Sequence, residues 1–299
     1  MQLCTSDFQH AYNQFERLSS KQPTVKSHLG AALAAFRQGD LNKMNKHFNQ
    51  ANNLTENTFA VRFCHAEALY QLKEYNAALV QLNLAEQKKP RQPQYYSLAI
   101  KIQQVKQNGP ALLKLLPSAK RHSNLSKAEL RDIEAEALQY ALTDTAAVSS
   151  EEELDALWQA CSKDNKKHAE IIFLYYQRLS QCNPERACAE IAKAITKNGF
   201  GYLTPLYLDA SSENNIDKLA KMESWQQKYP HEPVLFSCAA KLYQNEGMFK
   251  KAASALETAN GIQPSAELAA HLAQAYLKQG NDSKAIAYFQ QSLNDYQSS

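Results

Sequence analysis

Two segments near the C-terminus carry the same pattern of residues 33 positions apart, and a third segment earlier in the chain repeats much of it. A period of about 34 residues restricts the fold to a stack of similar units, each packed on its neighbours. The two strong segments contain Ala240, Tyr243, Gly247, Ala252 and Leu256, then Ala273, Tyr276, Gly280, Ala285 and Phe289, and the earlier one contains Ala66, Leu69, Ala78, Leu82, Ala85 and Pro90.

The residue types at these positions indicate what each unit is. Small residues such as Ala240 and Ala252 allow two helices to cross closely. Gly247 and Gly280 suit the turn after a first helix, because glycine adopts a positive φ without strain. Pro90 and Pro264 stand where a second helix must stop. We therefore expect an all-α, tetratricopeptide-like helical-repeat solenoid, a right-handed superhelix of antiparallel helix pairs.

Composition agrees with this architecture and excludes several classes of protein. Eight glycines in 299 residues are few for a barrel or a nucleotide-binding α/β fold. A net charge of +3 does not by itself imply nucleic acid or an acidic membrane. The six cysteines form no CxxC pair, which favours reduced thiols without zinc. No apolar run is long enough to span a bilayer, so we expect this chain to be soluble.

Breaks in the pattern suggest how the chain is organised. Residues 1–22 are expected to form an entry helix, and residues 143–151 a linker between N-terminal repeats (1–142) and C-terminal repeats (143–299) of the same solenoid. Ser149 or Ser150 can cap a helix that starts with three glutamates. We expect a helix to end or bend at Pro117, and the repeat at 199–209 to have a shortened or distorted first helix.

No motif for catalysis, cofactor binding or metal binding stands out. The chain has no glycine-rich phosphate loop, no GxSxG and no HExxH, and its eight histidines are dispersed. The short basic stretches lack interleaved aromatic residues, so we expect no nucleic-acid partner. We expect no enzyme activity, and neither catalytic residues nor cofactor or metal ligands.

The repeat register points instead to a surface for partners. The first helix of each pair is expected to line a concave groove, and Ala32, Ala66 and Ala99 mark its register. The N-terminal groove would then be apolar and aromatic, as partner sites often are. The candidate residues are Leu29, Leu33, Phe36, Phe63, Glu67, Tyr70, Tyr96 and Ile100.

Two alternatives for this groove stay open. Residues 1–22 could fill it, or it could be free to bind. The clamp by which some co-chaperones hold a C-terminal carboxylate needs Lys and Asn where Phe63 and Glu67 stand, so that function is disfavoured. Equivalent positions near the C-terminus are polar: Ser237, Lys241, Gln244, Ala270 and Gln274.

Beyond the repeats, the order of segments resembles one family. The stretches that carry the resemblance are Leu115–Lys120 before a Glu-rich helix, Trp158–Ala160 before a Lys-rich stretch and His168, and Leu203–Pro205 followed by Trp225, Pro233 and the two strong repeats. Their order over residues 25–296 is similar to that of the HemY family of proteobacteria.

The resemblance implies a protein of the haem-biosynthesis gene cluster, with two N-terminal transmembrane helices before a helical-repeat domain on the cytoplasmic side of the inner membrane. Late haem-pathway enzymes would be its partners. The unrelated flavin-dependent oxidase of the same name has a GxGxxG fingerprint that this chain lacks. The resulting hypothesis is a non-catalytic scaffold of haem biosynthesis. Alternatives are a haem or porphyrin carrier using Tyr70, Tyr96 or His65, and a generic peptide-binding repeat protein of envelope assembly.

Overall fold

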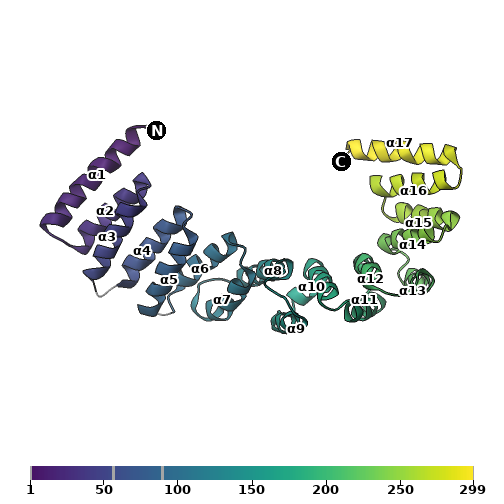
Figure 1. Ribbon diagram of the computed structural model, residues 1–299, viewed down its shortest axis with the longest axis horizontal. Coiled ribbons are helices and arrows are strands. Elements are labelled where there is room, and N and C mark those ends of the chain that lie inside the picture. Colours follow the sequence, from purple (N-terminus) through teal and green to yellow (C-terminus); the bar gives the residue numbers. More distant parts are fainter. Residues whose placement is uncertain (1, 56–57, 89–90, 299) are drawn as a thin grey trace. The chain divides into compact units, whose positions relative to one another are not determined.

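Helices are the only regular elements in the described residues. A computed structural model describes residues 2–55, 58–88 and 91–298, and within them it contains seventeen α-helices, two short 3₁₀ helices and no strand. Consecutive helices pack as antiparallel pairs, such as α2 with α3 and α14 with α15 (Figure 1). The expected all-α, tetratricopeptide-like fold is confirmed.

The chain divides into two compact units, Met1–Ala147 and Val148–Ser299, here called unit 1 and unit 2. The helices of unit 1 are α1 (Gln2–Lys21), α2 (Val25–Gln38), α3 (Leu41–Asn53), α4 (Thr58–Gln71), α5 (Tyr75–Lys88), α6 (Pro93–Val105), α7 (Gly109–His122) and α8 (Lys127–Thr143). Those of unit 2 are α9 (Glu151–Ala160), η1 (Asn165–Lys167), α10 (Ala169–Cys182), α11 (Pro184–Asn198), η2 (Gly201–Leu203), α12 (Thr204–Ala210), α13 (Asn215–Lys228), α14 (Pro233–Asn245), α15 (Phe249–Ile262), α16 (Ala266–Lys278) and α17 (Asp282–Ser298).

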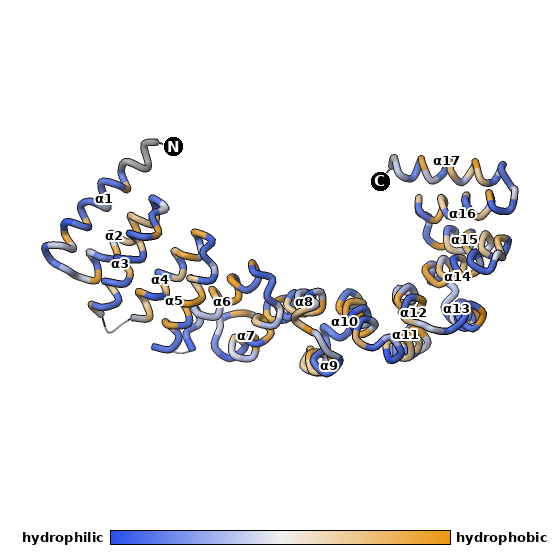
Figure 2. Tube along the Cα trace, in the orientation of Figure 1, coloured by the Kyte–Doolittle hydropathy of each residue, from blue (hydrophilic) through white to orange (hydrophobic). Residues whose placement is uncertain are grey.

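Each helix pair forms for the reasons that the spacing suggests. Most helices carry both hydrophobic and hydrophilic residues (Figure 2), and the hydrophobic ones supply the buried core of each unit. The register alanines Ala32 and Ala66 are completely buried, which lets paired helices approach closely. Gly247 and Gly280 have φ of 71° and 73°, as predicted for the turn between the helices of a pair.

Pro117 behaves differently from the simple rule that proline ends a helix. The helix was expected to end or bend at Pro117, and it does not end there, because Pro117 lies inside α7, which continues for five more residues. The turn that follows it contains Ala119, which is completely buried, and this packing outweighs the one backbone hydrogen bond that proline removes. Pro90, expected to stop the second helix of its repeat, lies outside the described residues.

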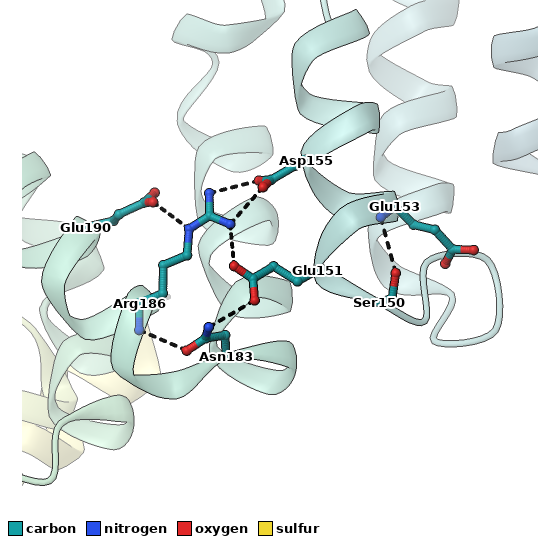
Figure 3. Close-up of polar contacts among 7 residues, drawn as sticks. All are labelled: Ser150, Glu151, Glu153, Asp155, Asn183, Arg186 and Glu190. Carbon is teal, nitrogen blue, oxygen red and sulfur yellow. Dashed lines mark hydrogen bonds and ion pairs between the residues drawn. The ribbon is translucent and has the colours of Figure 1, made fainter.

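The start of unit 2 follows the sequence closely. No helix is formed between Thr143 and Glu151, where the linker was predicted. Ser150, rather than Ser149, is the N-cap of α9, and its hydroxyl accepts a hydrogen bond from the backbone N–H of Glu153 (Figure 3). The first helix of the repeat at 199–209 is short, because α12 has only seven residues.

None of the described helices is both long enough and apolar enough to cross a membrane.

Candidate functional site

Six of the predicted partner-binding residues lie on the first helices of two neighbouring pairs. They stand three residues before, one after and four after the buried alanines Ala32 and Ala66, so in each helix they share one face. We call this surface the α2–α4 face, and it consists of Leu29, Leu33 and Phe36 on α2 and Phe63, Glu67 and Tyr70 on α4.

The α2–α4 face is apolar and only partly covered. Leu33 is 50% exposed, and it shares this face with four other apolar residues, which is what distinguishes a patch from a single exposed leucine. Its neighbours Leu29, Phe36, Phe63 and Tyr70 are partly buried, and each packs with one side against the core of unit 1. They therefore present apolar surface from fixed positions.

Contacts with adjacent side chains hold the aromatic rings of this face. Phe63 stacks on Phe59 with ring centroids 5.9 Å apart and an interplanar angle of 10°. Tyr70 lies 5.8 Å from the ring of Tyr75, and the Arg37 guanidinium is 5.6 Å from the centroid of Phe36. Rings held in this way lose little conformational entropy when a partner packs against them.

Glu67 is the one acidic member of the α2–α4 face. Partial desolvation raises the pKa of its carboxyl group, and the ammonium group of Lys101 on α6 opposes that rise. Cys64, whose thiol is exposed, is close to Glu67 in sequence. Partial desolvation raises the pKa of this thiol, and the charge of Glu67 adds to the rise. This end of the face is thus negatively charged, although the rest is apolar.

The other two predicted residues belong to the core. Tyr96 and Ile100 are only 4% and 3% exposed, and they pack in one cluster with Leu112, Ala119 and Ala137. The last of these residues is on α8, which also bonds to α6 through Gln104 Nε2 and Glu136 Oε2 at 2.5 Å. Because α7 and α8 cover this part of α6, Tyr96 and Ile100 do not line an open surface.

The N-terminal helix α1 packs beside the face without closing it. Phe15 lies against Gly30, where a Cβ atom would come within 2.5 Å of its ring. The backbone oxygen of Phe8 accepts a hydrogen bond from Gln38 Nε2 at 2.8 Å. These contacts are on the Gly30 side of α2, and Leu33 remains half exposed.

Two of the three residues considered for binding a tetrapyrrole are inaccessible. His65 is 2% exposed, its Nε2 lies 2.6 Å from Asn45 Oδ1, and its ring stacks on Phe48 at 4.4 Å. Tyr96 is buried as described above. Of these candidates only Tyr70 is partly exposed, and a macrocycle cannot reach the imidazole of His65 in this structure.

Other candidate chemistry is also sparse in the described part of the chain. It contains no group of three His, Cys, Asp or Glu side chains placed to hold a metal ion. Cys64, Cys161, Cys182, Cys188 and Cys238 are not in disulfide bonds. On α14 and α16 the positions equivalent to the α2–α4 face carry Ser237, Lys241, Gln244, Ala270 and Gln274, of which Lys241 and Gln274 are exposed.

One cluster in unit 2 was missed by sequence reasoning. The Arg186 guanidinium on α11 binds Glu151 and Asp155 of α9 at 2.6 and 2.8 Å and Glu190 of its own helix at 2.7 Å (Figure 3). Asn183 Nδ2 also donates to Glu151. The pairs 151/155 and 186/190 have the spacing of one helical face, which was the available signal. The cluster ties α9 to α11.

Comparisons with known proteins add little beyond the fold. No family model matches the chain, and no curated protein matches it in sequence. Similar solved structures include YrrB, a TPR protein with an unusual peptide-binding site (17% identity, 76% of this chain and 97% of that chain, TM-score 0.29). Others are PilW, a type IV pilus biogenesis factor (12%, 81% and 94%, 0.29), and the TPR domain of P58(IPK) (15%, 98% and 89%, 0.31). The fold assignment rests on the helix pairs of this chain.

Proposed function

We propose that this protein is a non-catalytic binding module that holds a segment of another protein on its α2–α4 face. The observation that carries the proposal is the half-exposed side chain of Leu33 among four partly buried apolar residues. Contiguous apolar surface of this kind is costly to leave in water and commonly marks a protein interaction site.

The chemistry of the face defines the segment that it suits. Leu33, Phe36, Phe63 and Tyr70 offer apolar contacts, so the segment needs at least one large aliphatic or aromatic side chain as an anchor. Glu67 favours a Lys or Arg of the partner at the α4 end. An amphipathic helix with a basic residue near one end of its apolar stripe combines both features.

The resemblance to the HemY family suggests which proteins supply such a segment. On that hypothesis the repeat domain is a scaffold near the inner membrane, and its partners are late enzymes of haem biosynthesis. This finer proposal depends on the order of segments in the sequence, whereas the binding surface depends on the exposed residues of α2 and α4.

The test compares two substitutions with the same chemistry. Leu33→Asp places a charge in the centre of the α2–α4 face, and Val80→Asp places one on α5 at a similarly exposed residue (56%) outside that face. A photoreactive phenylalanine analogue at Tyr70 would crosslink partners in the native host, and mass spectrometry would identify them. We expect Leu33→Asp to reduce the crosslinked partner by about tenfold or more, and Val80→Asp to leave it unchanged.

The outcomes separate the two levels of the proposal. Equal crosslinking in both variants would contradict the α2–α4 face as the binding surface. A partner that is lost only in Leu33→Asp but is unrelated to haem synthesis would retain the surface and reject the haem-pathway scaffold.

A further inference from the structure

Unit 2 contains a cavity that is far in sequence from the α2–α4 face. This cavity of about 560 Å³ lies between α11 and α13. This volume is within the range of sites that bind small molecules or a few side chains. Its lining consists of Ala192, Lys193, Thr196 and Lys197 on α11 and Lys221, Ser224 and Trp225 on α13.

Thr196 fixes the two walls of this cavity relative to each other. Its hydroxyl accepts a hydrogen bond from Trp225 Nε1 at 2.9 Å. Its backbone oxygen accepts two more, from Lys228 Nζ at 2.6 Å and the Tyr229 hydroxyl at 2.9 Å. Three donors from one helix end therefore meet at a single residue of the other helix, so the cavity is formed before any ligand arrives.

The charges around the cavity are almost all positive. Lys193 and Lys197 are exposed, stand one turn apart on α11, and form no ion pair with any residue that the structure describes. Two like charges at this spacing destabilise a helix slightly. Lys221 is neutralised by Glu213, and Lys228 donates to the Thr196 carbonyl. The rim on α11 thus carries two uncompensated positive charges.

The walls between the lysines are less polar. Ala192 and the indole of Trp225 contribute apolar atoms, and Trp225 is held edge-to-face against Tyr207 with centroids 5.1 Å apart. We propose that this cavity binds an acidic segment of a partner protein, in which two carboxylates face Lys193 and Lys197 and an apolar side chain between them enters the cavity.

Other anionic partners fit the cavity less well. Single-stranded nucleic acid is usually held by exposed aromatic faces on which bases stack, but Trp225 is only 4% exposed. A lipid bilayer presents a broad anionic surface, whereas these lysines border a hollow that admits a side chain. A peptide with alternating acidic and apolar residues fits both the charge and the shape.

Selection from a phage library of random 12-residue peptides tests the proposal on the full chain. Wild-type protein should enrich an acidic class with interspersed apolar residues. Lys193→Glu/Lys197→Glu should lose this class, and fluorescence anisotropy should show at least about tenfold weaker binding of a selected peptide. Lys193→Gln/Lys197→Gln should give a smaller loss, and circular dichroism would show that both variants are folded.

Two controls make the outcome specific. Lys163→Glu/Lys167→Glu introduces the same charges at the same spacing elsewhere in unit 2 and should leave binding unchanged. Leu33→Asp should also leave the acidic class intact, so failure here is distinguishable from failure of the α2–α4 face. Enrichment of no acidic class, or equal binding of that class by Lys193→Glu/Lys197→Glu, would overturn the proposal. The proposal would also be overturned if no acidic peptide bound while vesicles of phosphatidylserine and phosphatidylcholine bound through Lys193 and Lys197.

Discussion

Units 1 and 2 join their neighbouring helices with polar groups of different chemistry. In unit 1 the buried polar contacts among α1–α4 use imidazoles. The Tyr12 hydroxyl lies 3.2 Å from His47 Nε2, and His47 Nδ1 lies 3.1 Å from His28 Nδ1. His65 on α4 contacts Asn45 on α3. At most one of the facing His28 and His47 nitrogens can carry a hydrogen, so this contact needs at least one neutral ring.

In unit 2 the corresponding contacts use carboxylates. Tyr243 on α14 donates to Glu223 on α13 at 2.9 Å, and Tyr276 on α16 donates to Glu257 on α15. The two tyrosines are 33 residues apart and the two glutamates 34, so this is one bond repeated along the stack. The Arg186 cluster also uses carboxylates, those of Glu151, Asp155 and Glu190, to bind its guanidinium.

The difference teaches that one architecture can be held together by groups with opposite needs for protons. Burial lowers the pKa of His28 and His47, and lowers that of His65 to about 4, because the charged form is poorly solvated there. Arg186 lowers the pKa of Asp155, and Lys221 lowers that of Glu213. Acid therefore acts on the two units over different ranges of pH.

The largest difference in stability between the two units should come from adding a methyl group at Gly109 in unit 1. A Cβ atom there would clash with the backbone oxygen of Ala137 and the backbone nitrogen of Ala141, which have no freedom to rotate away. We expect Gly109→Ala to force α7 from α8 and to destabilise unit 1 by about 3 kcal/mol. Hydrogen exchange measured by mass spectrometry should accelerate in α6–α8 and stay unchanged in α14–α17. Unchanged exchange in both regions would contradict this packing.

Acidification should also destabilise unit 1 more than unit 2, by somewhat less than the substitution at Gly109. A histidine with a folded pKa below its unfolded value of 6.5 gives full stability above pH 6.5, and that contribution is lost as pH falls through this value toward the folded pKa. For His65, with a pKa of about 4, the loss at pH 5 is about 2 kcal/mol, and Lys46 adds to the lowering at His28 and His47. Hydrogen exchange in α2–α4 should accelerate between pH 7 and pH 5, after correction for the intrinsic rate.

Unit 2 should resist the same change. Carboxylates with lowered pKa keep their contribution above the ordinary carboxyl pKa of about 4, so the Arg186 cluster should hold until the pH falls below that range. His65→Gln is the matched variant and should remove most of the response of unit 1 between pH 7 and pH 5. If both units lost protection together, the contrast between imidazole and carboxylate would be wrong.

Removing the arginine of the cluster should weaken unit 2 alone. Arg186→Ala leaves three carboxylates close together without their common partner. Because the guanidinium is 29% exposed, water screens part of the repulsion, and we expect a loss of about 1 kcal/mol. Hydrogen exchange in α9 and α11, measured at increasing denaturant concentration, would give the midpoint of unfolding and thus the loss of stability. Arg131→Ala, at an exposed ion pair on α8, is the control and should have no measurable effect.

The smallest effect expected is a gain. Gly261 lies in α15 of unit 2, and nothing is within 4 Å of where its Cβ would be. Gly261→Ala should stabilise unit 2 by about 0.5 kcal/mol, because alanine loses less backbone entropy in a helix. The substitution at Gly109 has the same chemistry and the opposite sign. A loss of stability in Gly261→Ala would show that its surroundings are more crowded than described.

The sequence was enough to predict the helix pairs, the glycine turns and a cap at Ser149 or Ser150, because these depend on local spacing. It could not predict that Tyr96 and Ile100 are buried, since this depends on α7 and α8 packing across α6. Pro117 shows the same limit, because tertiary packing retains a helix that a local rule would end. The cavity beside Trp225 depends on the hydrogen bond between Trp225 and Thr196, which are about 30 positions apart, and no sequence motif predicts this contact.

Cys64 is a site at which the α2–α4 face can be labelled. It is the one exposed thiol among the cysteines whose side chains are described, and it lies on α4 beside Phe63. Its raised pKa keeps the reactive thiolate scarce at neutral pH, so alkylation there should be slow and should accelerate as the solution is made alkaline. A fluorophore attached at this site would report arrival of a partner as a change in emission, and the unlabelled thiol would report it as a slower rate of modification.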